Sequence, residues 1–127
     1  MSGNYEDLRG FIAQVEAMGA LRHIRGADPF LEIGAITEVA AGRAEGPALL
    51  FDDIPGFPKG FRIFTNSTVQ ARRAALALGI DPRLSPLEAL KEWKAKRSKL
   101  TPIDPVEVGE ALYMQNSQRG VDVDLSI

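Results

Sequence analysis

Side chains capable of chemistry are sparse in this sequence, and the pair with the greatest potential is Asp52 and Asp53, which follow a short apolar run. Two adjacent carboxylates at the end of a strand can act as a general acid and base, or can bind a cation. Such a site needs a histidine or a third acid beside it, and the sequence supplies neither. We therefore interpret this pair as a solvated strand exit.

The single histidine and the complete absence of cysteine narrow the chemistry further. Disulfides, thiolate metal sites and sites built from several histidines are excluded by count. A Ser-His-Asp arrangement would depend on His23, which lies among arginines in an expected strand and is better explained as structural. The sequence therefore predicts no catalytic, cofactor-binding or metal-binding residue.

The polar run Asn66-Ser67-Thr68 follows an expected strand and precedes an expected helix, which is where many α/β folds bind phosphate. No glycine-rich loop and no Gly-Lys-Ser/Thr sequence accompanies it, so the phosphate-binding fingerprints fail. A helix cap is the better interpretation.

Charge is distributed unevenly along the chain. Residues 69–100 carry 8 basic and 3 acidic side chains (+5), whereas residues 1–68 carry 6 and 9 (−3) and residues 101–127 carry 1 and 5 (−4). A basic block can attract nucleic acid, but Trp93 is the one aromatic residue within it and no reading motif is present. We favour a solvated or acid-facing helix and keep nucleic-acid binding as the weaker alternative.

These side chains depend for their positions on a small sheet, whose centre we expect at residues 46–52. This apolar run is bounded by Gly46-Pro47 and Pro55-Gly56, a pattern that predicts a strand buried on both faces. Helical patterns flank it on both sides. We therefore expect an α/β (α+β) fold, with a small mixed sheet covered by helices.

The remaining elements follow from periodicity and capping signals. Helices are expected at residues 4–18, 29–42, 67–78 and 86–99, and further strands at residues 21–25, 61–65, 106–114 and 121–125. The N-caps are expected at Asn4, Asp28, Ser67 and Ser85. Gly34 lies inside the helix expected at residues 29–42, and we expect that helix to approach the sheet or another helix closely at this position.

The third and fourth helices carry specific expectations about their faces. In the third, Arg72 and Arg73 are expected to point away from a buried side, which consists of Ala71, Ala74, Ala75 and Leu78. In the fourth, one side is apolar and the other is basic. The apolar side consists of Leu87, Leu90 and Trp93, and the basic side of Lys91, Lys94, Lys96, Arg97 and Lys99.

The chain of 127 residues is long enough for one domain with a genuine core. Its acidic N-terminus lacks the features of a signal peptide, and no apolar stretch approaches the ~20 residues of a membrane helix. With no cysteine, these features favour a cytoplasmic protein. The chain stops at Ile127 without a closing signal, so we expect a sequence cut in mid-course.

The order of several motifs resembles the N-terminal domain of the UbiD-type family of reversible decarboxylases. The similarity runs from about Asp7 to the last residue, and each motif is only moderately specific alone. The ordered motifs are Asp7-Leu8-Arg9-Gly10-Phe11, Leu21-Arg22-His23-Ile24, Asp28-Pro29-x-Leu31-Glu32-Ile33, Gly46-Pro47-Ala48-Leu49-Leu50-Phe51, Asn66, Ala75-Leu76-Ala77-Leu78-Gly79-Ile80 and Val121-Asp122-Val123-Asp124-Leu125.

The resemblance implies a lyase that removes CO2 from, or adds it to, aromatic or α,β-unsaturated carboxylic acids. It implies prenylated FMN, a divalent metal (Mn or Mg) and potassium as cofactors of the full enzyme, held in a split β-barrel that follows the N-terminal domain. A C-terminal domain would mediate homo-oligomer formation. The family's catalytic Glu-Arg-Glu/Asp network lies beyond Ile127, so no catalytic residue is carried over and this segment alone is expected to bind no cofactor.

The resemblance leads to a division into an N-terminal α/β domain at residues 1–100, followed by a linker and the start of the flavin-barrel region at residues 101–127. The partners expected are the remainder of a catalytic chain and a small carboxylic acid. An alternative is a free-standing assembly subunit that docks on a separate catalytic chain through Leu125, Ile127 and the acidic tail. Membrane partners are not expected.

Overall fold

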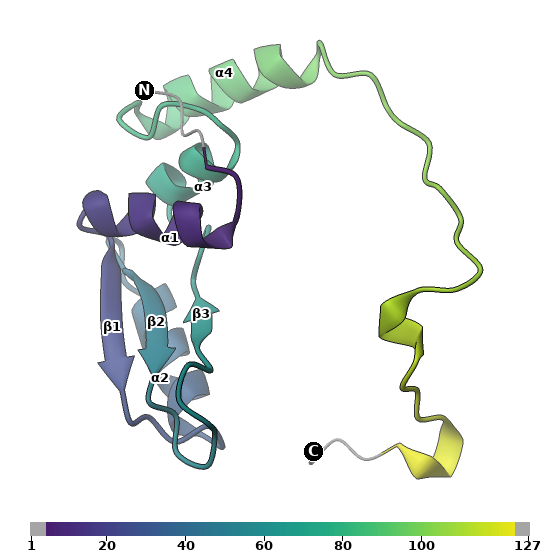
Figure 1. Cartoon of the computed structure of the whole chain (residues 1–127). Coiled ribbons are helices and arrows are strands. Elements are labelled where there is room, and N and C mark those ends of the chain that lie inside the picture. Colours follow the sequence, from purple (N-terminus) through teal and green to yellow (C-terminus); the bar gives the residue numbers. More distant parts are fainter. Residues whose placement is uncertain (1–4, 124–127) are drawn as a thin grey trace.

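A three-stranded mixed sheet organises the computed structural model, which describes residues 5–123. The strands β1 (Leu21–Arg25), β2 (Ala48–Asp52) and β3 (Ile63–Thr65) lie in the order β1-β2-β3, as Figure 1 shows. β1 and β2 are parallel, with Leu21 opposite Ala48, whereas β2 and β3 are antiparallel, with Leu50 opposite Phe64. The expected small mixed sheet with a central strand at residues 46–52 is confirmed.

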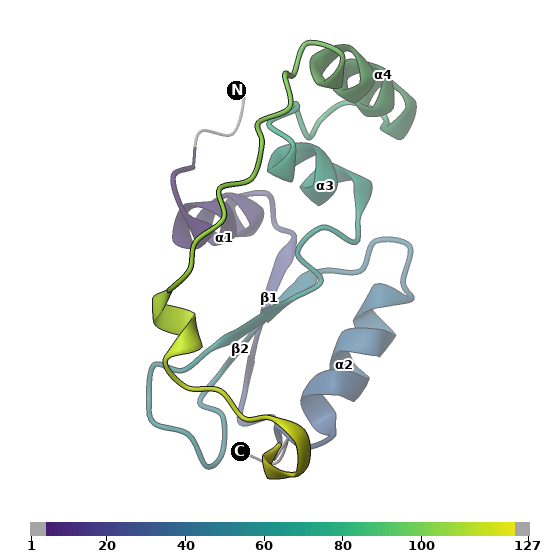
Figure 2. The same cartoon turned by 90° about the vertical axis from the view of Figure 1, so that its right-hand side faces the viewer.

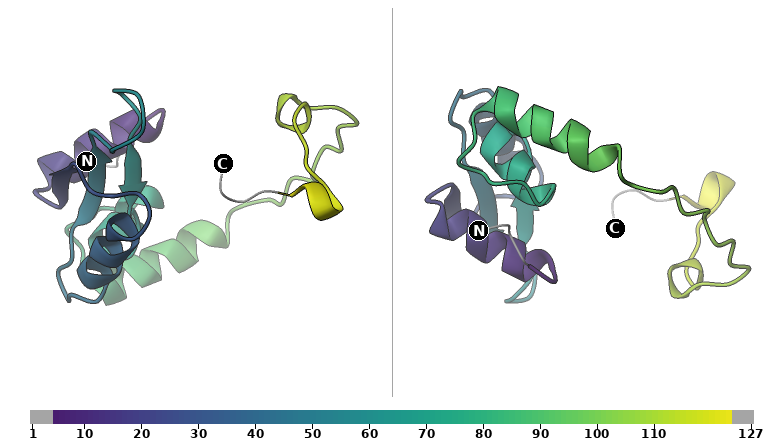
Figure 3. Two further views of the ribbon diagram at one scale, coloured as in Figure 1. Left: turned by 90° about the horizontal axis from the view of Figure 1, so that it is seen from below. Right: turned by 90° about the horizontal axis from the view of Figure 1, so that it is seen from above.

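Helices cover both faces of this sheet. The α-helices are α1 (Leu8–Ala17), α2 (Glu32–Ala41), α3 (Ala71–Ala77) and α4 (Pro86–Arg97), and two short 3-10 helices span Leu112–Met114 and Gly120–Asp122. Figure 3 shows α1 and α2 on opposite sides of the strands. Within residues 5–123, no helix is long and apolar enough to cross a membrane.

The core is divided between the two faces because side chains alternate along β2. Ala48 and Leu50 pack on the α1 side, with Phe11, Val15, Leu21 and Leu76. Leu49 and Phe51 pack on the α2 side, with Ala27, Ile33, Ala40 and Ile54. The four apolar residues of β2, Ala48 to Phe51, are therefore all buried, which explains why this strand reads as a continuous apolar run.

The start of α1 differs from the expectation. Its N-cap is Asp7, whose carboxylate accepts a hydrogen bond of 2.8 Å from the backbone N–H of Gly10. The expected cap, Asn4, lies outside the described residues. Gly19 ends the helix with φ +68°, as predicted.

The start of α2 is also later than predicted. The Asp28 carboxylate accepts from the N–H of Phe30 at 2.7 Å, and the Glu32 carboxylate accepts from the N–H of Asp28 at 2.8 Å. These bonds stabilise a turn, so the helix begins at Glu32 and Phe30 remains exposed. A Cβ added at Gly34 would meet nothing within 4 Å, so the close approach expected there was wrong.

Gly46 is the glycine that the fold requires between α2 and β2. A Cβ added there would lie 1.8 Å from the carbonyl oxygen of Ala40. The backbone of the α2–β2 connection therefore passes directly against the last turn of α2.

The structure corrects two expectations for α3. The helix begins at Ala71 with Gln70 as its N-cap and no side-chain capping bond, so the capping box expected at Ser67 was wrong. Arg73, expected to point away from the core, is buried, with only 3% of its surface exposed. Its Nε and Nη2 atoms both donate to the carbonyl oxygen of Asn66, at 3.2 and 3.0 Å.

The buried side of α3 is accordingly rotated from the predicted one. Ala75 and Leu76 are buried with Arg73, and Ala71 is exposed. Gly79 ends the helix with φ +67°, as expected.

The capping box that opens α4 is confirmed. The Ser85 hydroxyl donates to the Glu88 carboxylate at 2.6 Å, and the Ser85 backbone N–H donates to the same oxygen at 3.0 Å. At the other end of the helix, the Lys96 ammonium donates to the carbonyl oxygen of Leu78, which ties α4 to the end of α3. No residue of α4 is buried; on its apolar side Leu87 and Leu90 are exposed, and Trp93 is half-buried.

Beyond α4 the backbone is irregular except for the two 3-10 helices. The strand predicted at residues 106–114 was wrong: Val106 and Val108 are exposed and unpaired in a coil. The strand predicted at residues 121–125 is absent from residues 121–123, and the last two of its residues lie outside the described range. Figures 1 and 2 show this segment projecting away from the sheet and its helices, on the side of β3.

Candidate functional site: a basic groove beside β1

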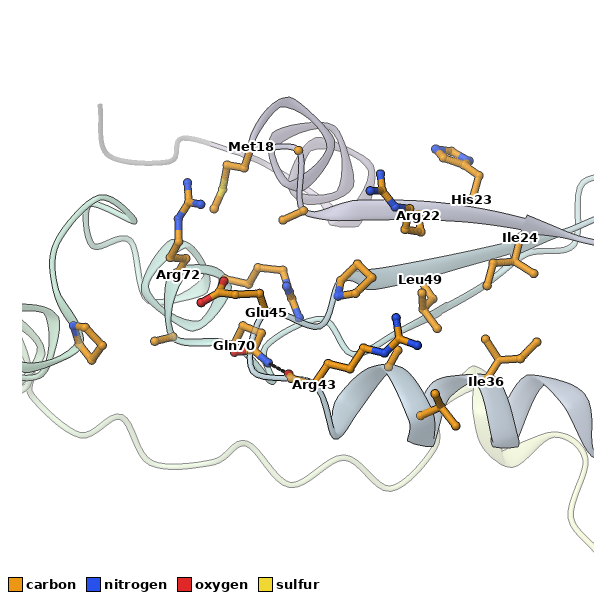
Figure 4. A pocket seen from close by; sticks show the side chains of 18 of the residues that line it. Met18, Arg22, His23, Ile24, Ile36, Arg43, Glu45, Leu49, Gln70 and Arg72 are labelled. Atoms are coloured by element: carbon orange, nitrogen blue, oxygen red, sulfur yellow. Dashed lines mark hydrogen bonds between the residues drawn. The ribbon is translucent and has the colours of Figure 1, made fainter.

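An open groove of about 1080 Å³ lies between β1, α2 and the start of α3. Its apolar lining includes Ile24, Ile36 and Leu49, and its charged lining includes Arg22 and Arg43, as Figure 4 shows. A mostly apolar hollow with a few charged groups at its margin is the usual form of a binding site.

The alternation of β1 and the placement of α2 together produce this groove. Arg22 is paired in register with Leu49 and Ile24 with Phe51, so both β1 side chains lie on the sheet face that α2 covers. α2 is held toward the opposite edge, because the Thr37 hydroxyl lies 3.1 Å from that of Thr65. The part of the face that belongs to β1 is consequently left open to the groove.

The groove carries more positive than negative charge. Arg22, Arg43, Arg72 and Arg73 line it with Glu45 as the one carboxylate. Within residues 5–123, neither Arg22 nor Arg43 forms an ion pair. The site therefore favours anionic ligands over cationic ones.

Arg73 differs from the other three arginines because it is structural. Burial lowers the pKa of its guanidinium, and the nearby Glu45 carboxylate acts in the opposite direction. Its two bonds to Asn66 fix a residue with φ +55°, a conformation that asparagine tolerates better than most residues. The exposed arginines are thus the ones available to a ligand.

The structure gives the candidate catalytic side chains separate partners. His23 lines the groove, and its Nε2 lies 3.0 Å from Glu16 Oε1. Asp53 lies 3.9 Å from Arg25, and Asp52 accepts from the backbone N–H of Asp53 at 2.9 Å. Among the described residues, these side chains form no arrangement of nucleophile, base and acid.

The described residues also fail to offer a metal site. Between residues 5 and 123, no group of three or more His, Cys, Asp or Glu side chains could hold a metal ion. A divalent metal needs several such donors. This part of the chain does not fit the metal that the resemblance implies.

Sequence reasoning missed the groove because its arginines come from three separate elements. Arg22, Arg43 and Arg72 are far apart in the chain and belong to no local motif. The available signal was Arg22, a charged residue that follows Leu21 in the strand beside the central one and shares a face of that strand with Ile24.

Comparisons with known proteins identify the family of this domain. Residues 12–94 match the family described as the 3-octaprenyl-4-hydroxybenzoate carboxy-lyase N-terminal domain. A curated relative, the phenolic acid decarboxylase of Streptomyces sp. (strain D7), is 36% identical over 124 residues, which are 95% of this chain and 26% of the relative.

Solved structures agree with this relationship. The vanillic acid decarboxylase of Sedimentibacter hydroxybenzoicus in its open form matches with a TM-score of 0.67 and 30% identity, over 80% of this chain and 21% of that chain. The closed form of the same enzyme matches with a TM-score of 0.61 and 28% identity, over 76% of this chain and 20% of that chain.

The chain thus spans about a quarter of the curated relative and a fifth of the solved chains. The family match covers all three strands of the sheet and all but the last three residues of α4. This chain belongs to the UbiD family, whose carboxy-lyase N-terminal domain it contains at residues 12–94.

Proposed function

We propose that this chain is the N-terminal, non-catalytic portion of a UbiD-like enzyme that reversibly decarboxylates aromatic or α,β-unsaturated carboxylic acids with prenylated FMN. The observation that carries the proposal is the family match at residues 12–94, together with relatives named as decarboxylases of which the chain spans about a quarter. The relatives' names favour phenolic acids as the substrate class.

In this proposal the domain supplies a docking surface and the catalytic portion supplies the chemistry. The flavin, its Mn or Mg ion and its potassium would be held by the catalytic portion of a homo-oligomeric enzyme. The apolar side of α4 is a suitable contact for that portion, because Leu87 and Leu90 are each 62% exposed. Exposed apolar patches of this kind often mark interfaces.

The proposal is tested by measuring cofactor binding and CO2 release with the purified chain. Prenylated FMN with Mn²⁺ and K⁺ is titrated against the chain and followed by flavin absorbance, and a panel of phenolic acids is then assayed. We expect neither stoichiometric flavin binding nor decarboxylation. Stoichiometric binding by this chain would contradict the non-catalytic assignment.

A free-standing assembly subunit is the second candidate, and the same exposed side of α4 favours it. In that case the chain would co-purify with a separate catalytic decarboxylase, and Leu90→Lys would weaken the association. The exposed Glu92 provides a matched control, since it lies two positions after Leu90 and Glu92→Ala therefore changes the opposite side of the helix. Equal retention of the partner by both variants would count against docking through α4.

A further inference from the structure

β1 has an unpaired edge beside the basic groove. Within residues 5–123, β1 pairs with β2 alone. The bonds from Ala48 N–H to Ala20 and from Gly26 N–H to Asp52 direct the even-numbered positions of β1 toward β2. In a parallel ladder the intervening residues, Leu21, His23 and Arg25, then direct their N–H and C=O groups outward. An edge of this kind is a template for another strand.

The side chains of β1 make the template selective for an acidic strand. Arg22 and Ile24 lie on the sheet face that α2 covers, whereas His23 and Arg25 alternate to the α1 face, although His23 also borders the groove. Across the groove, Arg43 adds a second cation and Ile36 continues the apolar floor. A strand that fits would place acidic and apolar side chains alternately over this surface.

Residues 104–110 of the same sequence have this composition. On one face of an extended strand they would present Asp104, Val106, Val108 and Glu110, which are two apolar residues between two acids. The other face would carry Glu107 opposite the His23 side of β1. Pro105 would fall at the start of the strand, where proline is tolerated.

This segment lacks a partner where it is described. Its alternating pattern predicts a strand, yet the structure leaves it as a coil with Val106 86% exposed. The segment prefers an extended strand but has no neighbouring strand to form hydrogen bonds with it. Pairing with the edge of another sheet would remove this conflict. The segment leaves its own domain on the side of β3, away from the free edge of β1 (Figure 1).

We propose that residues 104–110 of one copy add as a strand to β1 of a second copy, with their acidic side chains at the arginines of the groove. Reciprocal exchange of the two segments would give a closed two-fold dimer. Backbone bonds along β1 would supply affinity and the charge pattern would supply selectivity. The inference concerns the surfaces of this chain and is independent of its proposed part in decarboxylation.

Charge reversal in the full chain tests the pairing. Sedimentation equilibrium should show a dimer, and Arg22→Glu with Arg43→Glu should weaken it by about tenfold or more, since each like-charge contact opposes pairing. Asp104→Arg with Glu110→Arg should weaken it similarly, and combining all four changes should restore it. Arg62→Glu, at an exposed position outside the groove, is the matched control and should leave the dimer unchanged.

Disulfide trapping then identifies the contact, because the native chain contains no cysteine. A His23→Cys protein is mixed with a Glu107→Cys protein under mild oxidation, and a cross-linked heterodimer is expected. Lys59→Cys replaces His23→Cys in the control mixture, which should not cross-link above the background of random collision.

Three results would overturn the proposal. A chain that remains monomeric at high concentration and forms no heterodimer excludes exchange between copies. A dimer unaffected by the groove reversals uses another surface. If a protein that carries both His23→Cys and Glu107→Cys forms only an internal disulfide, the segment pairs with its own domain instead. None of these results depends on flavin binding or decarboxylation.

Discussion

The backbone of Gly46 lies so close to Ala40 that an added Cβ would clash with it and destabilise the α2–β2 connection. We expect Gly46→Ala to lower the free energy of unfolding by about 3 kcal/mol, because its Cβ would lie 1.8 Å from a backbone oxygen that cannot move independently. Urea denaturation followed by circular dichroism measures the effect.

Gly34→Ala is the matched control for this prediction. Gly34 lies inside α2 with open space around it, and alanine is favoured over glycine in a helix by about 1 kcal/mol. The two substitutions should therefore move the denaturation midpoint in opposite directions. A similar loss in both variants would show that the close contact at Gly46 is relaxed in solution.

The hydrogen bonds of the Glu88 carboxylate predict how the stability of the fold changes with pH. Hydrogen bonds from the Ser85 hydroxyl and N–H lower the pKa of its carboxyl. The ionised form is thus favoured in the folded state, so the contribution to stability is present above the ordinary glutamate pKa of about 4.3 and is lost as pH falls through the folded value. A pH titration followed by the NMR chemical shift of the Glu88 carboxyl carbon, in the folded and in the unfolded protein, measures the pKa in each state.

Ser85→Ala should raise the pKa of Glu88 toward its ordinary value and reduce the helicity of α4. Ser98→Ala is the control, because Ser98 donates to Ala95 at the far end of α4 and does not contact Glu88. An unchanged Glu88 titration in the Ser85→Ala protein would show that the capping box does not form.

Among the elements, α3 depends on one buried cation. Arg73 joins the helix to the end of β3 through two bonds to Asn66. We expect Arg73→Met, which keeps most of the side-chain volume, to cost about 2 kcal/mol by leaving that carbonyl unsatisfied. Chemical denaturation is the measurement.

Arg72→Met tests whether this cost is specific to the buried position. Arg72 is exposed and makes a single bond of 3.4 Å to Pro82, so its replacement should change stability by less than about 0.5 kcal/mol. Equal costs at the two positions would contradict the structural role assigned to Arg73.

The elements predicted correctly from sequence are those whose signals are local. β2 is recognisable because all of its core residues are apolar, and α4 because Ser85-Pro86 and Glu88 form a complete capping box. The burial of Arg73 could not be predicted in the same way, since it depends on the carbonyl of Asn66, just after β3, and not on helix periodicity. The strand expected at residues 106–114 failed because a strand requires a partner that a sequence pattern does not supply.

The candidate site was less predictable than the fold for a related reason. Asp52, Asp53 and His23 were the residues with obvious chemistry, but the turn after β2 and the edge position of β1 give them separate partners. The groove instead depends on how far α2 is displaced from β1. That displacement is set by contacts such as Thr37 with Thr65, which lie 28 positions apart in the sequence.

At the scale of the whole molecule, we expect the chain to divide near residue 100. Residues 101–111 are extended and almost entirely exposed, whereas the sheet and its helices bury a shared core. Limited digestion with a glutamate-specific protease should therefore cut first at Glu107 and Glu110 and leave a resistant N-terminal fragment. Mass spectrometry of the time course identifies the products.

Early cleavage inside α2, for example at Glu38, would contradict this division of the chain. Digestion in dilute and concentrated solutions adds a second comparison. If the segment exchanges between copies, Glu107 should be protected in the concentrated sample.

The connection at residues 79–85 is the pivot of α4, and the bond from Lys96 to the carbonyl of Leu78 holds the last turn of the helix against the end of α3. The helix spans 12 residues, or about 18 Å. A tilt of only about 10° at the pivot would displace its far end by roughly 3 Å over that length. The Lys96 ammonium group thus fixes the direction in which the chain leaves α4 after residue 97. Acetylation would neutralise its charge, and the chain after α4 would then sample a wider range of directions while the sheet stayed unchanged.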